Sequence, residues 1–276
     1  VVNEGYNSVS VIDGSTNSTQ TLFLTGTPIG LAINLVTNKI FATFINQNII
    51  AVIDGATNAI ETVAVGVSPS VIAVNPVTNK TYVATNTSVT VVDGASYATQ
   101  MIAISANGIN CIAVNPVTNK IYVGTFSGTP ADTLFVVDGT TNSVLPVTVG
   151  GNPNSIAINK ITNKIYVANQ NSNNVTIVDG ATNLTQTLTA GATPKDIAVN
   201  EVSNKIYVAN ANSNNVTVID GITNTTQTIP VGTYSWAVAI NLITNKIYVA
   251  SQLSNDVTVI ADSVVSTLPL SANISP

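Results

Sequence analysis

The reactive side chains of this chain are few, and their types restrict the chemistry that they can perform. Among 276 residues there are 13 carboxylates and 8 basic residues, all of them lysines, together with one cysteine and no histidine. Without an imidazole there is no Ser-His-Asp or Cys-His relay, no common type of zinc site and no histidine general base. The composition therefore disfavours catalysis that depends on histidine, and no catalytic residue is assigned.

Oxygen ligands leave one catalytic alternative open. Asn110 and Asn154 stand at equivalent places, each at the start of an apolar segment, and Asp196 stands one residue further into its own segment, directly after Lys195. Carboxylate and amide oxygens are the ligands that Ca²⁺ prefers, and a calcium ion usually takes about 6 to 8 of them. The preferred expectation is that no cofactor is bound. The alternative is a divalent cation such as Ca²⁺ on these three residues.

Other side chains suit recognition of a ligand better than catalysis. Aromatic rings offer apolar faces, while amides and charged groups fix the orientation of a bound molecule. We expect ten such residues to surround one mouth of a central channel: Tyr6, Phe44, Asn110, Phe126, Asp132, Asn154, Lys195, Asp196, Tyr234 and Trp236. This set predicts a site for a small molecule, a glycan or a protein.

These residues belong to a repeat of about 41 residues, whose clearest marker is Asp-Gly after an apolar segment. The marker begins at six aspartates, and Ala261-Asp262 takes the seventh place: Asp13, Asp54, Asp93, Asp138, Asp179 and Asp220. A unit of this length cannot bury its own apolar face and must stack on its neighbours. The chain therefore predicts a single domain, residues 1-276, built from seven units.

Each unit contains four short segments rich in β-branched residues and bounded by turn residues. In the sixth unit these segments are Asp196 to Asn200, Lys205 to Asn210, Asn215 to Asp220 and Thr226 to Val231. No helical periodicity occurs. The pattern predicts an all-β fold, a seven-bladed β-propeller of four-stranded antiparallel blades. A parallel β-solenoid is the rival, but its rungs are shorter than four hairpin-linked strands.

The expected blades span residues 1-26, 27-66, 67-105, 106-150, 151-191, 192-232 and 233-276. The first blade is incomplete, because Val1-Val2-Asn3 aligns with Val208-Ala209-Asn210 of a second strand. We expect this blade to lack its innermost strand and the chain to be part of a longer polypeptide. Either another segment supplies that strand, or its place stays empty or is partly filled by the tail.

The two faces of a propeller differ in how much the repeat varies. Turns after the first and third strands hardly change from copy to copy, and turn geometry explains their asparagines, glycines and aspartates. Loops after the second strand and between blades do change, and they lie on the opposite face. Variable loops on a rigid scaffold are where binding residues concentrate. We therefore expect the ten candidate residues to lie on that face.

Charge and hydropathy exclude two classes of partner. The net charge is −5, and no arginine is available for bidentate contacts to phosphate, so we expect no binding to nucleic acid. Mean hydropathy is +0.38, but no apolar run approaches the roughly 18 residues of a membrane-spanning helix. The hydropathy instead reflects many short buried strands.

Two motifs resemble those of the YVTN β-propeller family over essentially the whole chain. They are Asn-Lys-Ile-Tyr-Val-Ala-Asn at 163–169 and 204–210, and Asn-Val-Thr-Val-Ile-Asp-Gly at 215–221. The family includes cell-surface layer proteins, periplasmic proteins and propellers attached to enzymes. The resemblance implies a prokaryotic protein that is extracellular, on the cell surface or periplasmic, with other domains of a parent chain among its partners.

Fold does not determine function, so two functions remain in view. The first is a non-enzymatic binding or structural platform that acts through its variable face. The second is a metal-assisted hydrolase or lyase similar to the gluconolactonase group, with its cation at the channel mouth.

Overall fold

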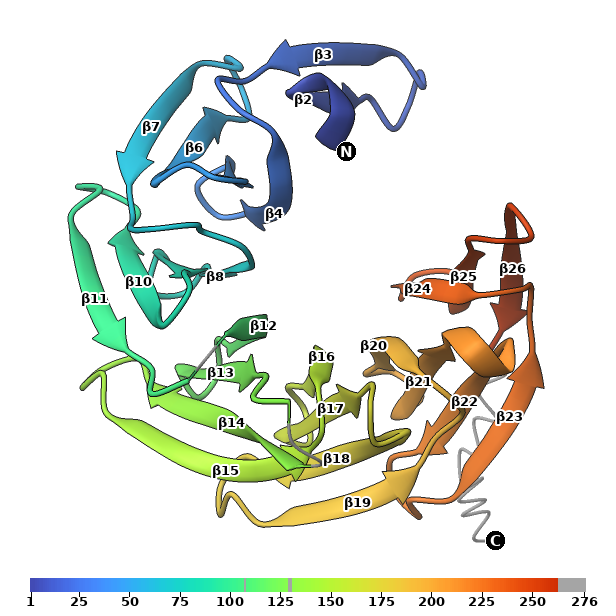
Figure 1. The fold of residues 1–276 in the computed structure, drawn as a ribbon. Coiled ribbons are helices and arrows are strands. Elements are labelled where there is room, and N and C mark those ends of the chain that lie inside the picture. Colours follow the sequence, from blue (N-terminus) through green and yellow to red (C-terminus); the bar gives the residue numbers. More distant parts are fainter. Residues whose placement is uncertain (107, 129–130, 263–276) are drawn as a thin grey trace, which may run out of the picture.

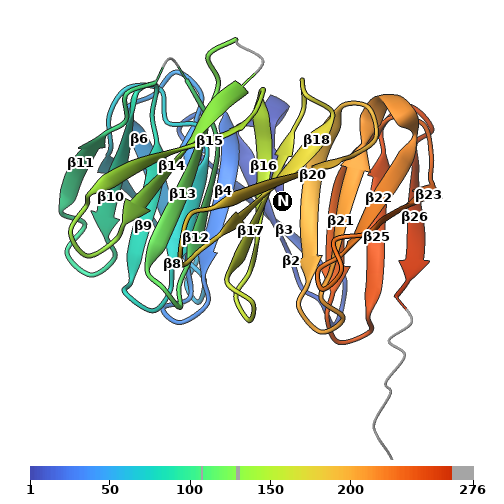
Figure 2. The same ribbon diagram turned by 90° about the horizontal axis from the view of Figure 1, so that it is seen from below.

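The structure of the chain is a computed structural model that describes residues 1–106, 108–128 and 131–262. These residues form seven antiparallel sheets and two short 3-10 helices, arranged as the blades of a propeller (Figure 1). The fold class predicted from the repeat is confirmed. Figure 2 shows the blades standing side by side, with their strands running between the two faces of the molecule.

The first three blades contain these strands. Blade 1 has β1 (Val2–Asn3), β2 (Ser8–Ile12) and β3 (Thr19–Phe23), with the helix η1 (Glu4–Tyr6) between β1 and β2. Blade 2 has β4 (Pro28–Asn34), β5 (Lys39–Phe44), β6 (Ile49–Asp54) and β7 (Ile60–Ala64). Blade 3 has β8 (Ile72–Asn75), β9 (Lys80–Ala84), β10 (Ser88–Asp93) and β11 (Thr99–Ala103).

The remaining four blades continue the same order. Blade 4 has β12 (Ile109–Asn115), β13 (Lys120–Thr125), β14 (Ala131–Asp138) and β15 (Val144–Gly150). Blade 5 has β16 (Pro153–Asn159), β17 (Lys164–Asn169), β18 (Asn174–Asp179) and β19 (Thr185–Thr189). Blade 6 has β20 (Pro194–Asn200), β21 (Lys205–Asn210), the helix η2 (Ala211–Ser213), β22 (Asn215–Asp220) and β23 (Thr226–Pro230). Blade 7 has β24 (Ser235–Asn241), β25 (Lys246–Ser251) and β26 (Asp256–Ala261).

Asparagine and aspartate shape the invariant turns. After β16, Asn163 takes a left-handed conformation with φ 53°, which asparagine tolerates better than most residues. After β18, the Asp179 Oδ1 accepts hydrogen bonds from the backbone N–H of Ala181 at 3.0 Å and Thr182 at 2.8 Å. The Thr182 contacts are the main cause that holds the pKa of Asp179 below its ordinary value. These polar residues are therefore parts of the turns.

Polar links on the same face join each blade to the next. The Asn159 Nδ2 of blade 5 donates to the Asn204 Oδ1 of blade 6 at 2.8 Å. The Lys164 Nζ donates to the Gly221 carbonyl at 3.2 Å. The asparagine link recurs at four further places, namely Asn34 to Asn79, Asn75 to Asn119, Asn115 to Asn163 and Asn200 to Asn245. The repeat thus uses the same polar contact to fix successive blades.

The apolar core lies in the seams, by which we mean the interfaces between consecutive blades. In the seam between blades 5 and 6, one cluster combines four residues of blade 5 with four of blade 6: Tyr166, Ala168, Val175 and Ile177 with Ile197, Ile206, Val208 and Ile219. The seam between blades 6 and 7 repeats this packing with Tyr207, Ala209, Val216 and Val218 against Val238, Ile247 and Val249. Each blade is therefore buried by its neighbours.

The ring formed by the described residues is open between blade 7 and blade 1. Figure 1 shows an arc whose two end blades do not meet. Blade 1 has three strands, as the sequence predicts, and its β1 holds two residues. A fourth strand for blade 7 was expected from the last repeat, and it falls outside the described residues. None of the helices in the described part of the chain has the length and apolar character needed to cross a bilayer.

Candidate functional site

A β-bulge near the start of the inner strand places the variable residues of five blades. The strand register shifts between Pro28 and Gly30 in blade 2, and at the equivalent place in blades 4 to 7. The residues inside the bulges are Ile29, Asn110, Asn154, Lys195 and Trp236. A bulge leaves the extra residue without a cross-strand partner and turns its side chain away from the ladder. Four of these five residues are predicted site residues.

Three predicted residues from blades 6 and 7 form one cluster. The Lys195 Nζ lies 4.6 Å from the centre of the Trp236 ring, a cation–π distance. The rings of Tyr234 and Trp236 stack with their centres 5.7 Å apart. We call Lys195, Tyr234 and Trp236 the aromatic cluster. It remains accessible, because Trp236 is 47% exposed.

Blade 5 contributes to the position of Lys195. Its ammonium group donates to the Gln170 Oε1 at 3.0 Å, and the Asn154 Nδ2 donates to the Lys195 carbonyl at 2.6 Å. Partial burial lowers the pKa of Lys195 from its ordinary value. The lysine is thus held between blades 5 and 7, rather than extended into solvent.

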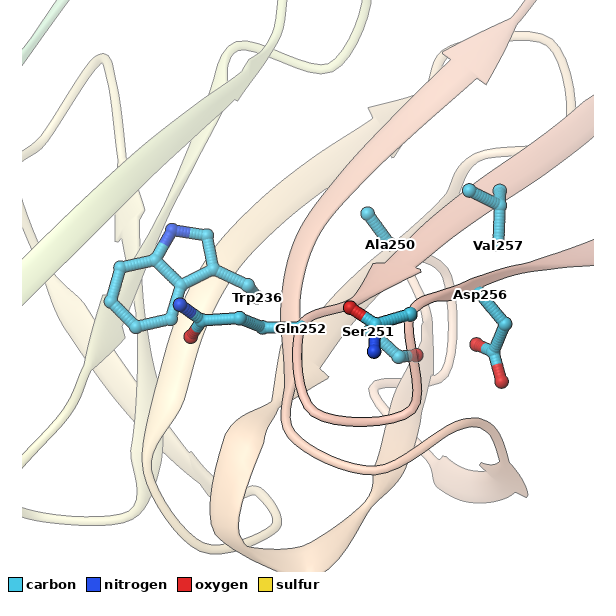
Figure 3. A pocket seen from close by; sticks show the side chains of 7 residues that line it. Trp236, Ala250, Ser251, Gln252, Asp256 and Val257 are labelled. Atoms are coloured by element: carbon cyan, nitrogen blue, oxygen red, sulfur yellow. The ribbon is translucent and has the colours of Figure 1, made fainter. Parts of the chain in front are cut away.

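A cavity of about 490 Å³ adjoins the aromatic cluster. It is lined by Trp236 from β24, by Gln252 and Asn255 in the loop between β25 and β26, and by the ends of these two strands. Figure 3 shows the Gln252 side chain extending toward the indole ring. An aromatic wall with a nearby amide combines an apolar surface with a hydrogen-bonding group, as ligand sites commonly do.

The surroundings of Asp196 do not favour the hypothesis that it binds a divalent cation. Its Oδ1 accepts from the Ser155 hydroxyl at 2.8 Å and from its neighbour's backbone N–H, and its Oδ2 accepts from the Val238 N–H at 2.9 Å. Burial raises the pKa of this carboxyl group, while these hydrogen bonds oppose the shift. The carboxylate ties blades 5, 6 and 7 together, so binding a cation would require some of these bonds to break.

Asn110 and Asn154 lie together at the centre of the molecule. Both line a cavity of about 240 Å³ with residues of blades 2 to 5. The Asn110 Nδ2 donates to the Asn152 Oδ1 at 2.7 Å. Asp196 is not part of this lining. In the described parts of the chain, no three His, Cys, Asp or Glu side chains gather as a metal site would require.

The other predicted residues are dispersed. Tyr6 is largely exposed on blade 1, and Phe126 lines a separate cavity of about 360 Å³ beside Thr133. Asp132 is buried, where its carboxylate accepts from the backbone N–H of Ser127 at 2.8 Å and of Asn152 at 2.6 Å. Asp132 therefore holds two loops together and offers no free carboxylate to a ligand.

The expectation that Phe44 lies on the rim is wrong. Phe44 ends β5 and is fully buried in a cluster with Ala42 and Ala51, with Leu31 packed against it. Phe44 occupies the last position of the second strand, the place that Asn210 takes in blade 6. A large ring at the last strand position can pack into the seam, and there it presents no face to a ligand.

Sequence reasoning missed two glutamines. Gln170 and Gln252 each follow the second strand of their blade, a position that varies between copies. Variation was the signal that selected the bulge residues, and applied to this position it would have found both. The aromatic cluster and these amides form the best-organised group of predicted residues on the variable face.

Comparisons with known proteins establish the fold. No protein-family model matches the sequence, and the search of curated proteins gives no match. Among solved structures, one chain of hydrazine synthase from Kuenenia stuttgartiensis is similar, with a TM-score of 0.77 and 17% identity over 95% of this chain and 91% of that one. A protein of unknown function from Desulfotomaculum acetoxidans aligns with a TM-score of 0.75 and 15% identity, covering 95% and 91%.

A chain of a mitotic checkpoint complex is similar to the same degree. Its TM-score is 0.77, with 14% identity over 93% of this chain and 82% of that one. The names of these proteins indicate no common function, and their sequence identity to this chain is 14 to 17%. The likeness therefore supports the β-propeller and assigns no activity.

Proposed function

We propose that this propeller is a non-enzymatic binding platform whose ligand is a glycan, recognised at the aromatic cluster. The observation that carries the proposal is the exposed Trp236 ring, placed by a bulge beside Lys195, Gln252 and a cavity of about 490 Å³. Sugars offer C–H faces that pack on an indole, and hydroxyl groups that bond to amides and ammonium groups. A small molecule or a protein is the other class of ligand for this surface.

The backbone conformation of Tyr234 supports a role of its ring in ligand binding. Its φ is 60°, in the left-handed region, while the equivalent positions hold Asn152, Thr193 and Ser68. A left-handed tyrosine costs on the order of 1 kcal/mol compared with a residue suited to that region. The tyrosine ring stacks on Trp236 and so enlarges the aromatic surface. The stacking of Tyr234 on Trp236 gives a reason for a bulky ring in this strained position.

The experiment uses the single tryptophan of the chain, Trp236, as its own reporter. An array of neutral and acidic oligosaccharides selects a ligand, and its affinity is then measured by tryptophan fluorescence and by calorimetry. We expect Tyr234→Ala and Lys195→Gln to weaken binding about tenfold, which corresponds to about 1.4 kcal/mol. Trp236→Ala, followed by calorimetry, should abolish it.

Ile243→Ala is the matched control, because Ile243 is an exposed apolar residue of the same blade in the turn after β24. It should bind like the unaltered protein. If no oligosaccharide binds, or if binding survives Trp236→Ala, the glycan proposal is wrong, and arrays of small molecules and proteins would test the remaining classes.

The wider setting is also part of the proposal. We infer an extracellular, cell-surface or periplasmic protein of the YVTN-repeat group, and the repeated Lys-Ile-Tyr-Val-Ala-Asn motifs support that inference. Such a platform would display its variable face while its invariant turns hold the blades in place.

A further inference from the structure

The last blade exposes a surface that blades 2 to 6 bury against their next neighbour. Val257 and Val259 of β26 are 57% and 52% exposed, whereas their counterparts Val216 and Val218 in β22 are 0% and 3% exposed. Tyr248 and Ala250 of β25 are also exposed on this side. We call Tyr248, Ala250, Val257 and Val259 the open face. Its residues are apolar like those of a protein core, but nothing in the described part of the chain covers them.

The molecule itself shows what fits such a face. Residues equivalent to the open face in blade 5 are covered by Ile197 of β20 and by Ile206 and Val208 of β21. Those in blade 6 are covered by Val238, Ile247 and Val249, again from the first two strands of the next blade. The complement is therefore a β-hairpin with β-branched residues at three defined positions, two of them on its second strand.

The cavity of about 490 Å³ lies at the rim end of the open face and marks an unfilled seam. Elsewhere the residue that opens the next blade occupies this place. Pro153 packs against Gly124, the counterpart of Ala250, and the Ser235 hydroxyl donates to the Asn210 carbonyl at 3.0 Å. In the cavity wall, the buried Ser251 hydroxyl has no hydrogen-bond partner in the described structure.

Blade 1 presents the matching unfilled edge across the opening. Its β1 pairs with the first part of β2, through Val2 with Val9 and Asn3 with Ser8, and Val1 and Ser10 exchange backbone hydrogen bonds. Further along β2, Ile12 is 51% exposed, and its counterpart Ile219 is completely buried. In blade 6 the strand that covers Ile219 pairs Ile206 directly with it. The free edge of β2 therefore accepts one more segment of strand.

Val1 completes the match. It aligns with Val208, one of the three residues that cover blade 5, and it is exposed at the opening. The chain thus already carries one of the three apolar residues of the complement. The two that are missing correspond to Ile197 and Ile206.

We propose that the opening between blades 7 and 1 is a docking site for a partner β-hairpin of the repeat's own chemistry. The hairpin extends blade 1 by pairing with β1 and with Val11 and Ile12 at the end of β2, and its apolar side packs on the open face. This is recognition by strand addition, in which backbone hydrogen bonds give affinity and side-chain pockets give specificity. The hairpin would reach the cavity of about 490 Å³ that also adjoins the aromatic cluster, so the two proposals share this cavity and are tested by separate measurements.

A peptide copied from residues 194–207 is the probe. It contains the first strand, the turn and the second strand as far as Tyr207, so it ends where Val1 takes over in the alignment. We expect saturable binding to the intact chain, measured by anisotropy of the labelled peptide, with micromolar affinity on the order expected when a short segment must fold as it binds. Hydrogen exchange should slow in β2 and β26.

Two sets of variants test the contact. In the peptide, replacing the residues equivalent to Ile197 and Ile206 with aspartate should weaken binding at least tenfold. In the protein, Val257→Asp and Val259→Asp should do the same, and both side chains are exposed enough for the fold to tolerate the change. Val202→Asp is the control, because Val202 is an exposed valine in the turn after β20.

The outcomes separate this proposal from its alternatives. Binding that is lost with the open-face variants, but kept in Val202→Asp, supports the hairpin site. Equal binding of a scrambled peptide overturns it. A concentration-dependent dimer of the chain alone, disrupted by Val257→Asp, would show that a second copy covers the open face and would also overturn it. Glycan binding at Trp236 is measured separately, so failure of one proposal leaves the other standing.

Discussion

Tyr207 of blade 6 and Tyr248 of blade 7 occupy the same position of the same repeat, and their surroundings differ. Tyr207 is buried between two blades, where Val216 and Val218 of its own blade and Val238 of the next complete the cluster. Tyr248 faces the opening of the arc, beside the exposed Val259. The two strands are nearly identical in sequence, so the difference comes from the neighbour. In this protein, burial is a property of the seam.

The difference in burial between the two tyrosines predicts a difference in their contributions to the free energy of unfolding. Removing a buried aromatic ring costs the transfer free energy of its atoms and leaves a cavity, whereas removing an exposed ring leaves neither. Equivalent substitutions in the two blades therefore isolate the contribution of one seam. The following predictions use such pairs.

The largest effect is expected from the tyrosines. Tyr207→Ala should lower the free energy of unfolding by about 3 to 5 kcal/mol. Tyr248→Ala should lower it by less than about 1 kcal/mol, since surface changes have small effects. Urea denaturation measures both, and Tyr166→Ala, in another closed seam, should behave like Tyr207→Ala. Equal losses for Tyr207 and Tyr248 would mean that the open face is covered in solution.

The second effect concerns a polar link across the same seam. The Lys205 Nζ lies 2.6 Å from the Asp262 Oδ1, and Asn200 also donates to this nearly buried carboxylate. Asp262→Ala should cost about 3 kcal/mol, because it leaves the Lys205 ammonium group without its carboxylate and removes one of the two acceptors of the Asn200 amide. Asp54→Ala breaks the more exposed Lys39–Asp54 pair and one turn, and should cost about 1 kcal/mol. If the two variants lose similar free energies of unfolding, the position of Asp262 in the seam does not strengthen its ion pair.

Acid should weaken the same contacts. Burial raises the pKa of Asp262, but Lys205, Ser203 and Tyr207 lower it more, so its net shift is below the ordinary 3.8. A lowered pKa contributes stability above the unfolded value, and this stability is lost as the pH falls through the folded value. We expect the melting temperature to drop below about pH 3.8, and to drop less steeply in Asp262→Asn. If the melting temperature of Asp262→Asn falls with pH as steeply as that of the unaltered protein, Asp262 is not the cause of the acid sensitivity.

The smallest effect is a hydroxyl in place of a methyl group. Val218→Thr buries a hydroxyl group in the seam and should cost about 1 to 2 kcal/mol. Val259→Thr, at the equivalent position of the open face, should change stability by less than about 0.5 kcal/mol. Thermal unfolding of the two variants checks the difference. If Val259→Thr is as costly as Val218→Thr, another molecule already occupies the open face.

Local patterns accounted for most of the fold. The Asp-Gly and Asn-Lys turns were identified in the sequence because their backbone requirements involve neighbouring residues only. The missing inner strand of blade 1 was predicted from the alignment of Val1 with Val208. The site was predicted less completely, since Lys195 and Trp236 were placed on one rim, but their contact and the role of Gln170 were not anticipated.

The sequence by itself determined the repeat, the strands within it and the face on which variation gathers, because each depends on residues close together in the chain. The tertiary structure decided which equivalent residues are buried, that Phe44 and Asp132 turn inward, and that Asp196 bonds to Ser155 and Val238 on either side. Asp132 bonds to backbone groups 5 and 20 residues away, whereas the bonds of Asp196 and the burial of equivalent residues rest on contacts about one repeat apart. They depend most on whether a next blade is present to make them.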